Sequence, residues 1–244
     1  MTDRSPPEPS ARARRPVLGY VFLGISVLVV PAATLLSIAF TEGLGATMAA
    51  ETARVVRSGL NPLIGSVLEE RGLKLVEERR DILLSAAAEF DLPAEWLGAV
   101  MFAESRGRSG LKSSAGALGL MQLVESAARD AAGRVGIELP TDSEALEEAL
   151  LEDAALNVRL GAAHLAWLIE HRGDWSDEAV MVSYNAGRAR LFQWIEKRGS
   201  YEGFVAAEED RVSRGERGTG ALSYARQVLR AREALRVRGR LASR

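Results

Sequence analysis

Residues 94–122 read AEWLGAVMFAESRGRSGLKSSAGALGLMQ and decide the fold of this chain. The first part is apolar almost all round, with Glu104 near its end. A helix that is apolar on every face is buried by other elements in a globular protein. Gly107 and Gly110 interrupt the pattern, and a loop rich in glycine and serine follows. We therefore predict a central, buried helix over residues 93–105 that carries a glutamate at its C-terminal end.

The segments around this helix also carry helical periodicity, whereas no segment shows the alternation of apolar and polar residues that is typical of a strand. The sequence therefore predicts an all-α domain with seven or eight helices. Ahead of Pro93, apolar residues line one helix face at Ile82, Leu83, Ala86, Ala87 and Phe90. The later helices are expected from about Leu120 to Ala132, over 144–156 behind a capping box at Thr141 and Glu144, from Asn157 to Ile169, from Asp177 to Tyr184 and from Arg188 to Lys197.

The composition excludes several kinds of chemistry. The chain has 244 residues, of which 47% are hydrophobic and 26% charged, as in ordinary globular proteins. The formal net charge of −2 argues against nucleic acid as a partner. Because there is no cysteine, disulfides, thiolate nucleophiles and Cys-ligated metals are excluded. The two histidines, His164 and His171, lie in no recognisable metal motif, so we expect no metal and no cofactor.

Residues 16–41 form an uncharged stretch that is long enough to cross a membrane. Arginines precede it within residues 1–15, and Glu42 is the first charge after it. Because basic residues stay on the cytoplasmic side, we predict a single-pass signal anchor in the inner membrane. Its N-terminal tail would be cytoplasmic, and the large C-terminal part would face the periplasm and cell wall. The alternative is a cleaved signal peptide, whose apolar region is usually only about 7–15 residues long.

The part that follows the apolar stretch divides into three segments in this interpretation. Glycines interrupt weak helical patterns over residues 42–75, which we expect to be a partly helical spacer. The domain itself is expected over residues 76–230, and a basic tail over 231–244. Seven arginines and one glutamate from Arg226 to Arg244 are typical of a basic amphipathic helix. That helix is either a solvated end of the chain or a contact with anionic lipid headgroups or wall polymer.

Glu104 carries the clearest chemical signal. A carboxyl group in apolar surroundings is costly to ionise, so its pKa should rise. The partial negative charge at a helix C-terminus acts in the same direction. A carboxylic acid that keeps its proton near neutral pH can donate it to a glycosidic oxygen. Taken alone, the local pattern also fits a solvated glutamate at a helix end before a glycine loop.

The motifs around Glu104 resemble those of the family 1, or SLT-domain, lytic transglycosylases, which are related in fold to goose-type lysozyme. The resemblance covers about residues 78–230 and implies an all-α, lysozyme-like domain behind the N-terminal membrane helix. The spacing from the glutamate to the next serine and glycine matches without insertion. The similar motifs are Glu104-Ser105, Ser113, Gly116-Ala117-Leu118-Gly119-Leu120-Met121-Gln122, residues 157–165 with His164 where tyrosine is usual, and Ser183-Tyr184-Asn185-Ala186-Gly187.

This resemblance implies cleavage of the β-1,4 bond between N-acetylmuramic acid and N-acetylglucosamine in peptidoglycan, with formation of a 1,6-anhydro end. Glu104 would act first as acid and then as base, while the muramic 6-hydroxyl attacks its own anomeric carbon. One acid suffices because the nucleophile is tethered to the reacting centre. The residues expected to bind substrate are Ser113, Gly116, Ala117, Gly119, Met121, Gln122, Tyr184, Asn185 and Tyr224.

The sequence departs from the family pattern near its C-terminus. Gly220 and Ala221 stand where the family often has Glu-Thr before a tyrosine, here Tyr224. Two alternatives therefore stay open: a lysozyme-like peptidoglycan hydrolase, or a catalytically weak wall-binding or assembly module on the same fold. The expected partners are peptidoglycan glycan strands, the inner membrane through residues 16–41, and cell-envelope machinery that the sequence does not identify.

Overall fold

The computed structural model describes residues 64–242. The chain divides into two units, Met1–Ser66 and Val67–Arg244, and helices α3 to α11 belong to the second. Residues 64–77 are also helical, and isolated β-bridges join Leu118 to Lys112 and to Leu123, so the predicted all-α class is confirmed for the described part. The helices are α3 (Arg80–Glu89), α4 (Ala94–Ser105), α5 (Glu125–Val135), α6 (Ser143–Glu152), α7 (Ala154–Glu170), α8 (Asp177–Ala186), α9 (Arg188–Arg198), α10 (Tyr201–Ser213) and α11 (Ala221–Arg238).

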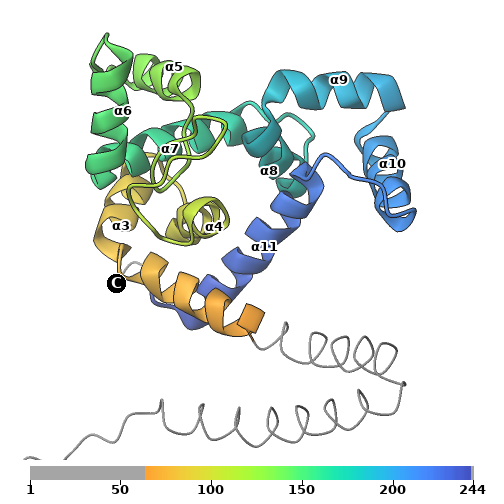
Figure 1. Cartoon of the computed structure of the whole chain (residues 1–244), viewed down its shortest axis with the longest axis horizontal. Helices are drawn as coiled ribbons and strands as arrows, with labels where there is room; N and C mark the ends of the chain where they lie inside the picture. The colour runs from red at the N-terminus through yellow and green to blue at the C-terminus, as the bar shows by residue number, and fades with distance from the viewer. Residues whose placement is uncertain (1–63, 243–244) are drawn as a thin grey trace, which may run out of the picture. The chain divides into compact units, whose positions relative to one another are not determined.

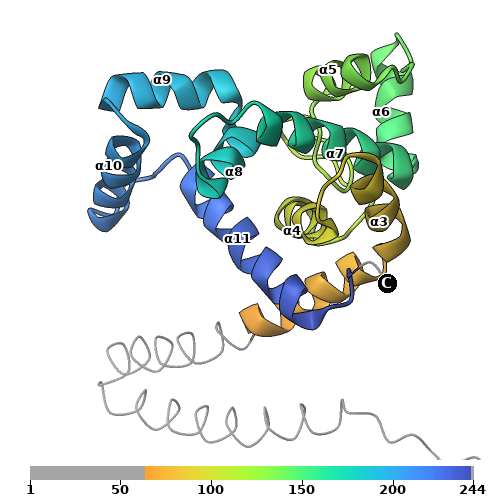
Figure 2. The ribbon, with the colours of Figure 1, turned by 180° about the vertical axis from the view of Figure 1, so that it is seen from behind.

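Helix α4 lies among α3, α7, α8 and α11, as Figures 1 and 2 show from opposite sides. Its residues are buried except for Glu95, Ala103 and Glu104, which confirms the prediction of a central helix. It ends where Arg106 adopts a left-handed conformation at φ 57°, followed by Gly107 at φ 73°. The apolar sequence of α4 thus places its last turn, with Glu104, at the edge of the hydrophobic core.

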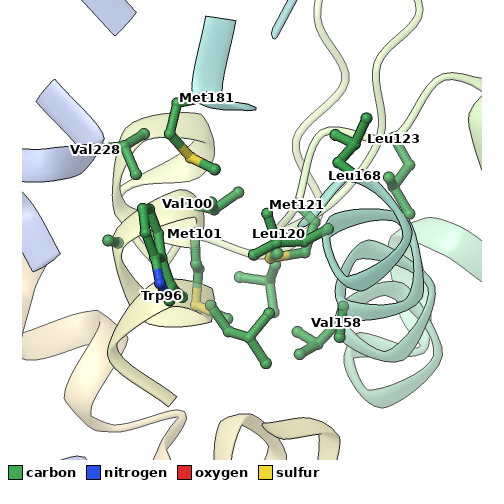
Figure 3. Close-up of a cluster of buried hydrophobic side chains, with 14 of the residues drawn as sticks. Trp96, Val100, Met101, Leu120, Met121, Leu123, Val158, Leu168, Met181 and Val228 are labelled. Atoms are coloured by element: carbon green, nitrogen blue, oxygen red, sulfur yellow. The ribbon is translucent and has the colours of Figure 1, made fainter. Parts of the chain in front are cut away.

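The core joins α4 to the glycine-rich loop that follows it. In Figure 3 the side chains of Trp96, Val100 and Met101 on α4 lie beside Met181 of α8 and Val228 of α11. The same view shows residues of the loop, Leu120, Met121 and Leu123, directed toward Val158 and Leu168 of α7. Burying each such side chain contributes about 1.5–3 kcal/mol to the free energy of unfolding, so the apolar residues hold the loop against the core.

The loop is also held by one buried amide. The Oδ1 atom of Asn157, in α7, accepts a hydrogen bond from the Met121 amide at 2.8 Å. Its Nδ2 atom donates to the carbonyls of Leu118 at 3.0 Å and Leu150 at 3.2 Å. Gly119, at φ 73°, lies so close that a Cβ atom there would stand 2.7 Å from the Leu150 carbonyl oxygen. A side chain at this position would therefore push the loop off the asparagine.

Two of the predicted helix starts need correction. The helix expected from Leu120 begins at Glu125, because Leu118 and Leu123 exchange backbone hydrogen bonds of 3.0 Å that hold residues between them in a turn. The helix expected behind a capping box at Thr141 is capped instead by Asp142, whose side chain accepts from the Ala145 amide at 2.9 Å. In both places the pattern predicts a helix correctly, but the observed boundary lies one to five residues from the expected one.

Helix α10 was not predicted. Its exposed positions carry a run of charged residues, and only Phe204 and Glu208 are buried, so its sequence has little helical periodicity to detect. It packs on α9, and Figure 1 shows the two helices extending away from α4. Ser200 begins α10 by accepting a hydrogen bond from the Gly203 amide at 3.0 Å.

The boundaries expected at residues 75/76 and 230/231 both fall inside helices. Leu73 and Val76 are buried, and so are Leu235 and Leu241, so the expected spacer and tail each contribute to the core. The guanidinium of Arg238 pairs with Glu70 at 2.8 Å and also with Glu77. The basic stretch at the end of the chain is therefore engaged with the protein's own carboxylates over α11.

The predicted cytoplasmic tail (1–15), membrane anchor (16–41) and most of the spacer (42–75) lie outside the described residues. Between residues 64 and 242, none of the helices combines the length and the apolarity that crossing a bilayer requires.

Replacing Gly119 with alanine should lower the free energy of unfolding much more than replacing Gly116. Both glycines have positive φ, 73° and 78°, but only Gly119 has atoms within 4 Å of an added Cβ. The conformational penalty shared by both is about 1–2 kcal/mol, and the lost Asn157 contacts should bring the Gly119→Ala loss to roughly 3 kcal/mol or more. Urea unfolding of the full-length variants measures this, and equal losses would contradict the asparagine clamp.

Candidate active site

Glu104 lies in the last turn of α4 with its side chain largely withdrawn from water. Burial raises the pKa of this carboxyl group from the ordinary value of 4.5 to about 7, and the hydroxyl of Tyr224 opposes part of that rise. The shift has the direction that the apolar sequence of α4 predicts, and desolvation is its main cause. The residue still keeps a partly exposed surface. Glu104 is thus an acid that is still partly protonated at neutral pH and keeps some exposed surface.

Two tyrosines from other helices stand beside this carboxyl group. Tyr184 comes from α8 and Tyr224 from α11, and burial together with the charge of Glu104 raises the pKa of both hydroxyl groups well above the usual value. The Tyr184 hydroxyl donates to the Met121 carbonyl at 3.3 Å. The Tyr224 hydroxyl is buried and makes no hydrogen bond of normal geometry with any described residue, so its effect on Glu104 is that of a longer polar contact. The tertiary structure therefore brings together three of the residues expected at the site.

The polar groups of Ser113 and Gln122 make most of their hydrogen bonds within the loop itself. The Ser113 Oγ atom accepts from the Ala117 amide at 2.9 Å, and the Ser113 amide donates to the Ala117 carbonyl at 2.8 Å. Gln122, at φ 46°, donates through Nε2 to the carbonyls of Gly119 at 2.9 Å and Leu111 at 3.2 Å. The Ser113 hydroxyl proton and the Gln122 Oε1 atom are the groups that these internal bonds leave for a ligand.

Several predicted substrate contacts require correction or a different role. The side chain of Met121 is fully buried and lies against Gly161, so it packs in the core rather than lining an open surface. Gly119 allows a close approach of Asn157, which by itself accounts for a glycine at this position. Gly116, in contrast, has open space around it, and Asn185 is exposed directly after Tyr184. The common reason is that the sequence alone does not distinguish an apolar or small residue that packs in the core from one that contacts a ligand.

A groove of about 700 Å³ runs along the outer side of the loop, between it and helices α5 and α6. It shares Gly116 with the expected site, but Glu104 does not line it. The acid therefore lies elsewhere, beside Tyr184 and Tyr224. The residues that line the groove are Lys112, Ala115, Gly116, Leu118, Val124, Glu125, Ser126, Ser143, Glu144, Leu146 and Glu147.

Sequence reasoning did not single out Glu208. This buried carboxylate of α10 accepts hydrogen bonds from the Thr219 amide at 2.7 Å and the Thr219 hydroxyl at 2.9 Å. It therefore places an acidic group beside Gly218 and Thr219, directly before Gly220 in the chain. No local signal could have found it, because Glu208 belongs to a helix that the periodicity does not reveal.

His164 of α7 packs on Tyr184. The two ring centroids lie 5.3 Å apart, and the Nδ1 atom of His164 is buried without a hydrogen-bond partner among the described residues. Burial, and to a smaller extent the charge of Arg134, lowers the pKa of His164 to about 4, so the ring is neutral at physiological pH. A neutral imidazole next to Tyr184 leaves Glu104 as the titrating group of this neighbourhood near pH 7.

The comparisons with known proteins fit this geometry. The family model of the transglycosylase SLT domain matches residues 81–206, just over half of the chain. The chain belongs to the SLT transglycosylase domain family. The matched range begins in α3, includes Glu104 and the loop after it, and ends in α10. A comparison with curated protein sequences found no match.

Solved structures support the SLT fold at low sequence identity. An inactive mutant of the lytic transglycosylase Slt from Pseudomonas aeruginosa is 23% identical with a TM-score of 0.54, and the match covers 67% of this chain and 25% of that one. The 70-kDa soluble lytic transglycosylase of Escherichia coli is 22% identical with a TM-score of 0.51, and the match covers 64% of this chain and 24% of that one. In a complex of the 70-kDa soluble lytic transglycosylase with bulgecin A, the protein is 20% identical with a TM-score of 0.58, and the match covers 86% of this chain and 31% of that one. The chain thus spans about a quarter to a third of these proteins.

Replacing Glu104 with glutamine should change the stability of this SLT domain in a pH-dependent way. Because folding raises the pKa from 4.5 to about 7, the contribution of the protonated carboxyl group is complete below pH 4.5 and is lost as the pH rises through 7. That loss amounts to about 3 kcal/mol, and glutamine does not suffer it. Relative to the wild type, Glu104→Gln should therefore gain stability between pH 4.5 and pH 8.

Urea unfolding of the full-length protein at several pH values measures this difference. Glu148→Gln is the matched control, since Glu148 is an exposed glutamate on α6. A constant difference between wild type and Glu104→Gln across the pH range would show that the carboxyl group is not desolvated.

Proposed function

We propose that this chain is a lytic transglycosylase that cleaves the β-1,4 bond between N-acetylmuramic acid and N-acetylglucosamine in peptidoglycan. The observation that carries the proposal is Glu104, with a pKa raised to about 7 between Tyr184 and Tyr224 in a domain of the SLT family. A group with a pKa near the working pH can both give and take a proton at useful rates.

The reaction needs both proton transfers from the same side chain. In the first step the Glu104 carboxylic acid protonates the glycosidic oxygen, the bond from that oxygen to the anomeric carbon breaks, and positive charge develops on the sugar. In the second step the Glu104 carboxylate takes the proton of the muramic 6-hydroxyl, whose oxygen bonds to the anomeric carbon. The product carries a 1,6-anhydro ring, and Glu104 ends protonated as it began. Because the attacking hydroxyl belongs to the same sugar, the second step is intramolecular.

The two tyrosines suit the charge that forms on Glu104 between these steps. Their raised pKa values keep both hydroxyl groups neutral, and Tyr224, unlike Tyr184, has not committed its proton to the Met121 carbonyl, so it remains a donor toward a carboxylate. A preorganised donor that strengthens as charge develops lowers the barrier of such a step. Tyr224 has a hydroxyl group free of other hydrogen bonds among the described residues, which fits this role.

Two acidic residues that follow the loop motif in the sequence do not offer a second catalytic carboxylate. Glu125 accepts a hydrogen bond from Arg129 at 2.8 Å, and Asp130 pairs with Arg134, both within α5. Glycosidases that hydrolyse usually pair two carboxylates across the bond. Because Glu125 and Asp130 are paired with arginines, the single-acid route is favoured over the lysozyme-like alternative.

We also propose that residues 16–41 anchor the protein in the inner membrane as a single span, with residues 1–15 in the cytoplasm and the SLT domain on the periplasmic side. The support is the uncharged stretch with arginines on one flank. This arrangement would bring the domain to the cell wall and beside cell-envelope machinery.

Glu104→Gln should abolish the release of 1,6-anhydro muropeptides from isolated peptidoglycan. Loss of the acid and base should reduce the rate by at least about 10²-fold, as measured by mass spectrometry of the released fragments. Asp130→Asn is the control and should retain activity. Products with reducing ends would support a hydrolase instead, and binding of peptidoglycan without Glu104-dependent products would support a wall-binding module.

The rate should fall as the pH rises through about 7, because only protonated Glu104 can begin the reaction. Tyr224 lowers the pKa of Glu104, so Tyr224→Phe should move this decline to higher pH while reducing the maximal rate. Tyr201→Phe is the matched control, since the Tyr201 hydroxyl donates to Glu178. A pH profile that Tyr224→Phe leaves in place would contradict the contact between this hydroxyl and the acid.

A further inference from the structure

Arg188, the first residue of α9, is held by three aromatic rings. Its guanidinium carbon lies 4.8 Å from the ring centroid of Trp175, 5.1 Å from that of Phe192 and 5.5 Å from that of Trp167. One of its nitrogens, Nη1, donates to the carbonyl of His171 at 2.6 Å. We refer to Arg188, Trp167, Trp175 and Phe192 as the Arg188 cluster. Cation–π contacts and a backbone bond fix the orientation of this arginine.

The rings of the cluster are themselves held in place. Trp167 stacks on His171 with centroids 4.8 Å apart, and Arg134 lies over its face at 4.0 Å. Trp175 and Phe192 contact each other with centroids 4.9 Å apart. Phe192 is nevertheless 48% exposed, an unusual position for a phenylalanine held among other aromatic side chains. The cluster thus presents a rigid cation and an exposed ring on the same surface.

The charge of Arg188 is not neutralised by the protein. No ion pair joins it to an acidic side chain in the described range 64–242, although most arginines of α11 have such partners. Two nearby carboxylates are paired with other arginines, Asp130 with Arg134 and Asp177 with Arg172 at 2.9 Å. A guanidinium group has five N–H donors, and the single hydrogen bond to the His171 carbonyl leaves most of them for an anion. Arg188 is therefore preorganised to bind a carboxylate.

The cluster continues from the site of Glu104. Tyr184, beside Glu104, packs on His164, and Trp167 lies one turn further along α7 than His164. Arg188 follows Tyr184 by four residues, across the Gly187 turn between α8 and α9. The cluster therefore stands on the same two segments, α7 and the α8–α9 segment, that carry His164 and Tyr184.

We propose that the Arg188 cluster binds a carboxylate of the peptidoglycan strand close to the cleaved bond, with the exposed ring of Phe192 against the apolar part of the ligand. This inference rests on the proposed function, because it takes the same polymer as ligand. Two groups of peptidoglycan carry this chemistry: the free lactyl carboxylate of muramic acid in strands without peptides, and the carboxylates of the stem peptides. Both offer the planar, bidentate acceptor that a fixed guanidinium prefers.

Calorimetric titration of the full-length Glu104→Gln protein tests the proposal without consuming the ligand. Three probes separate the sources: a tetrasaccharide of alternating muramic acid and glucosamine residues with free lactyl groups, the same tetrasaccharide with stem peptides, and neutral chitotetraose. A further Arg188→Gln substitution should weaken binding of one or both carboxylated probes by roughly tenfold or more and leave chitotetraose unchanged. Arg190→Gln is the matched control, because it removes an exposed arginine from the same helix.

Loss of affinity for the lactyl probe alone assigns the lactyl group, and loss for the peptide probe alone assigns the stem peptide. Arg188→Lys keeps the positive charge but lacks the planar guanidinium, so this variant should bind the carboxylated probes with intermediate affinity. It replaces Arg188→Gln in the titrations if Arg188→Gln does not fold. Equal losses for chitotetraose would show a structural role and overturn the proposal, as would unchanged affinities. If the Glu104→Gln parent binds none of the probes, the proposal fails, and release of anhydro muropeptides by the wild type then shows whether the proposed activity fails with it.

Discussion

Keeping one carboxyl group out of water is the constraint on which the site depends. Helix α4 is buried along nearly its whole length, and this burial raises the pKa of Glu104 to about 7. An isolated buried carboxylate is unfavourable, so the protonated form is held until a reaction needs its proton. The same burial costs stability above pH 7, which is the usual exchange between stability and activity at a functional site.

The loop after α4 has to stay in place for Glu104 to meet a ligand, and it is held by groups that are not part of the chemistry. Asn157 binds the backbone on both sides of Gly119, and Met121 fills the space beside Gly161. The Met121 carbonyl also accepts from Tyr184, so loop and site share one hydrogen bond. The short contacts around Gly119 show that packing alone requires a glycine there.

Among the described residues, buried polar atoms without partners lie next to this site. They are the Nδ1 atom of His164, the hydroxyl of Tyr224 and the hydroxyl of Ser183, which precedes Tyr184. Buried polar groups are nearly always paired in native proteins, and exceptions point to a functional reason. Tyr224 interacts with the acid and His164 packs on Tyr184, so two of the three unpaired atoms belong to residues of this neighbourhood.

The sequence by itself determined the central helix, its end near Gly107, the all-α class and the raised pKa of Glu104, because each depends on residues within a few turns of one another. It also predicted Tyr184 and Tyr224 at the site, the first through a motif that resembles the family and the second in a segment that departs from its pattern. Only the tertiary structure decided that Met121 belongs to the core, that Gly119 faces Asn157, and that Glu208 and Arg188 have their present neighbours. The physical reason is that periodicity shows which side of a helix is apolar, whereas what covers that side is supplied by residues tens of positions away.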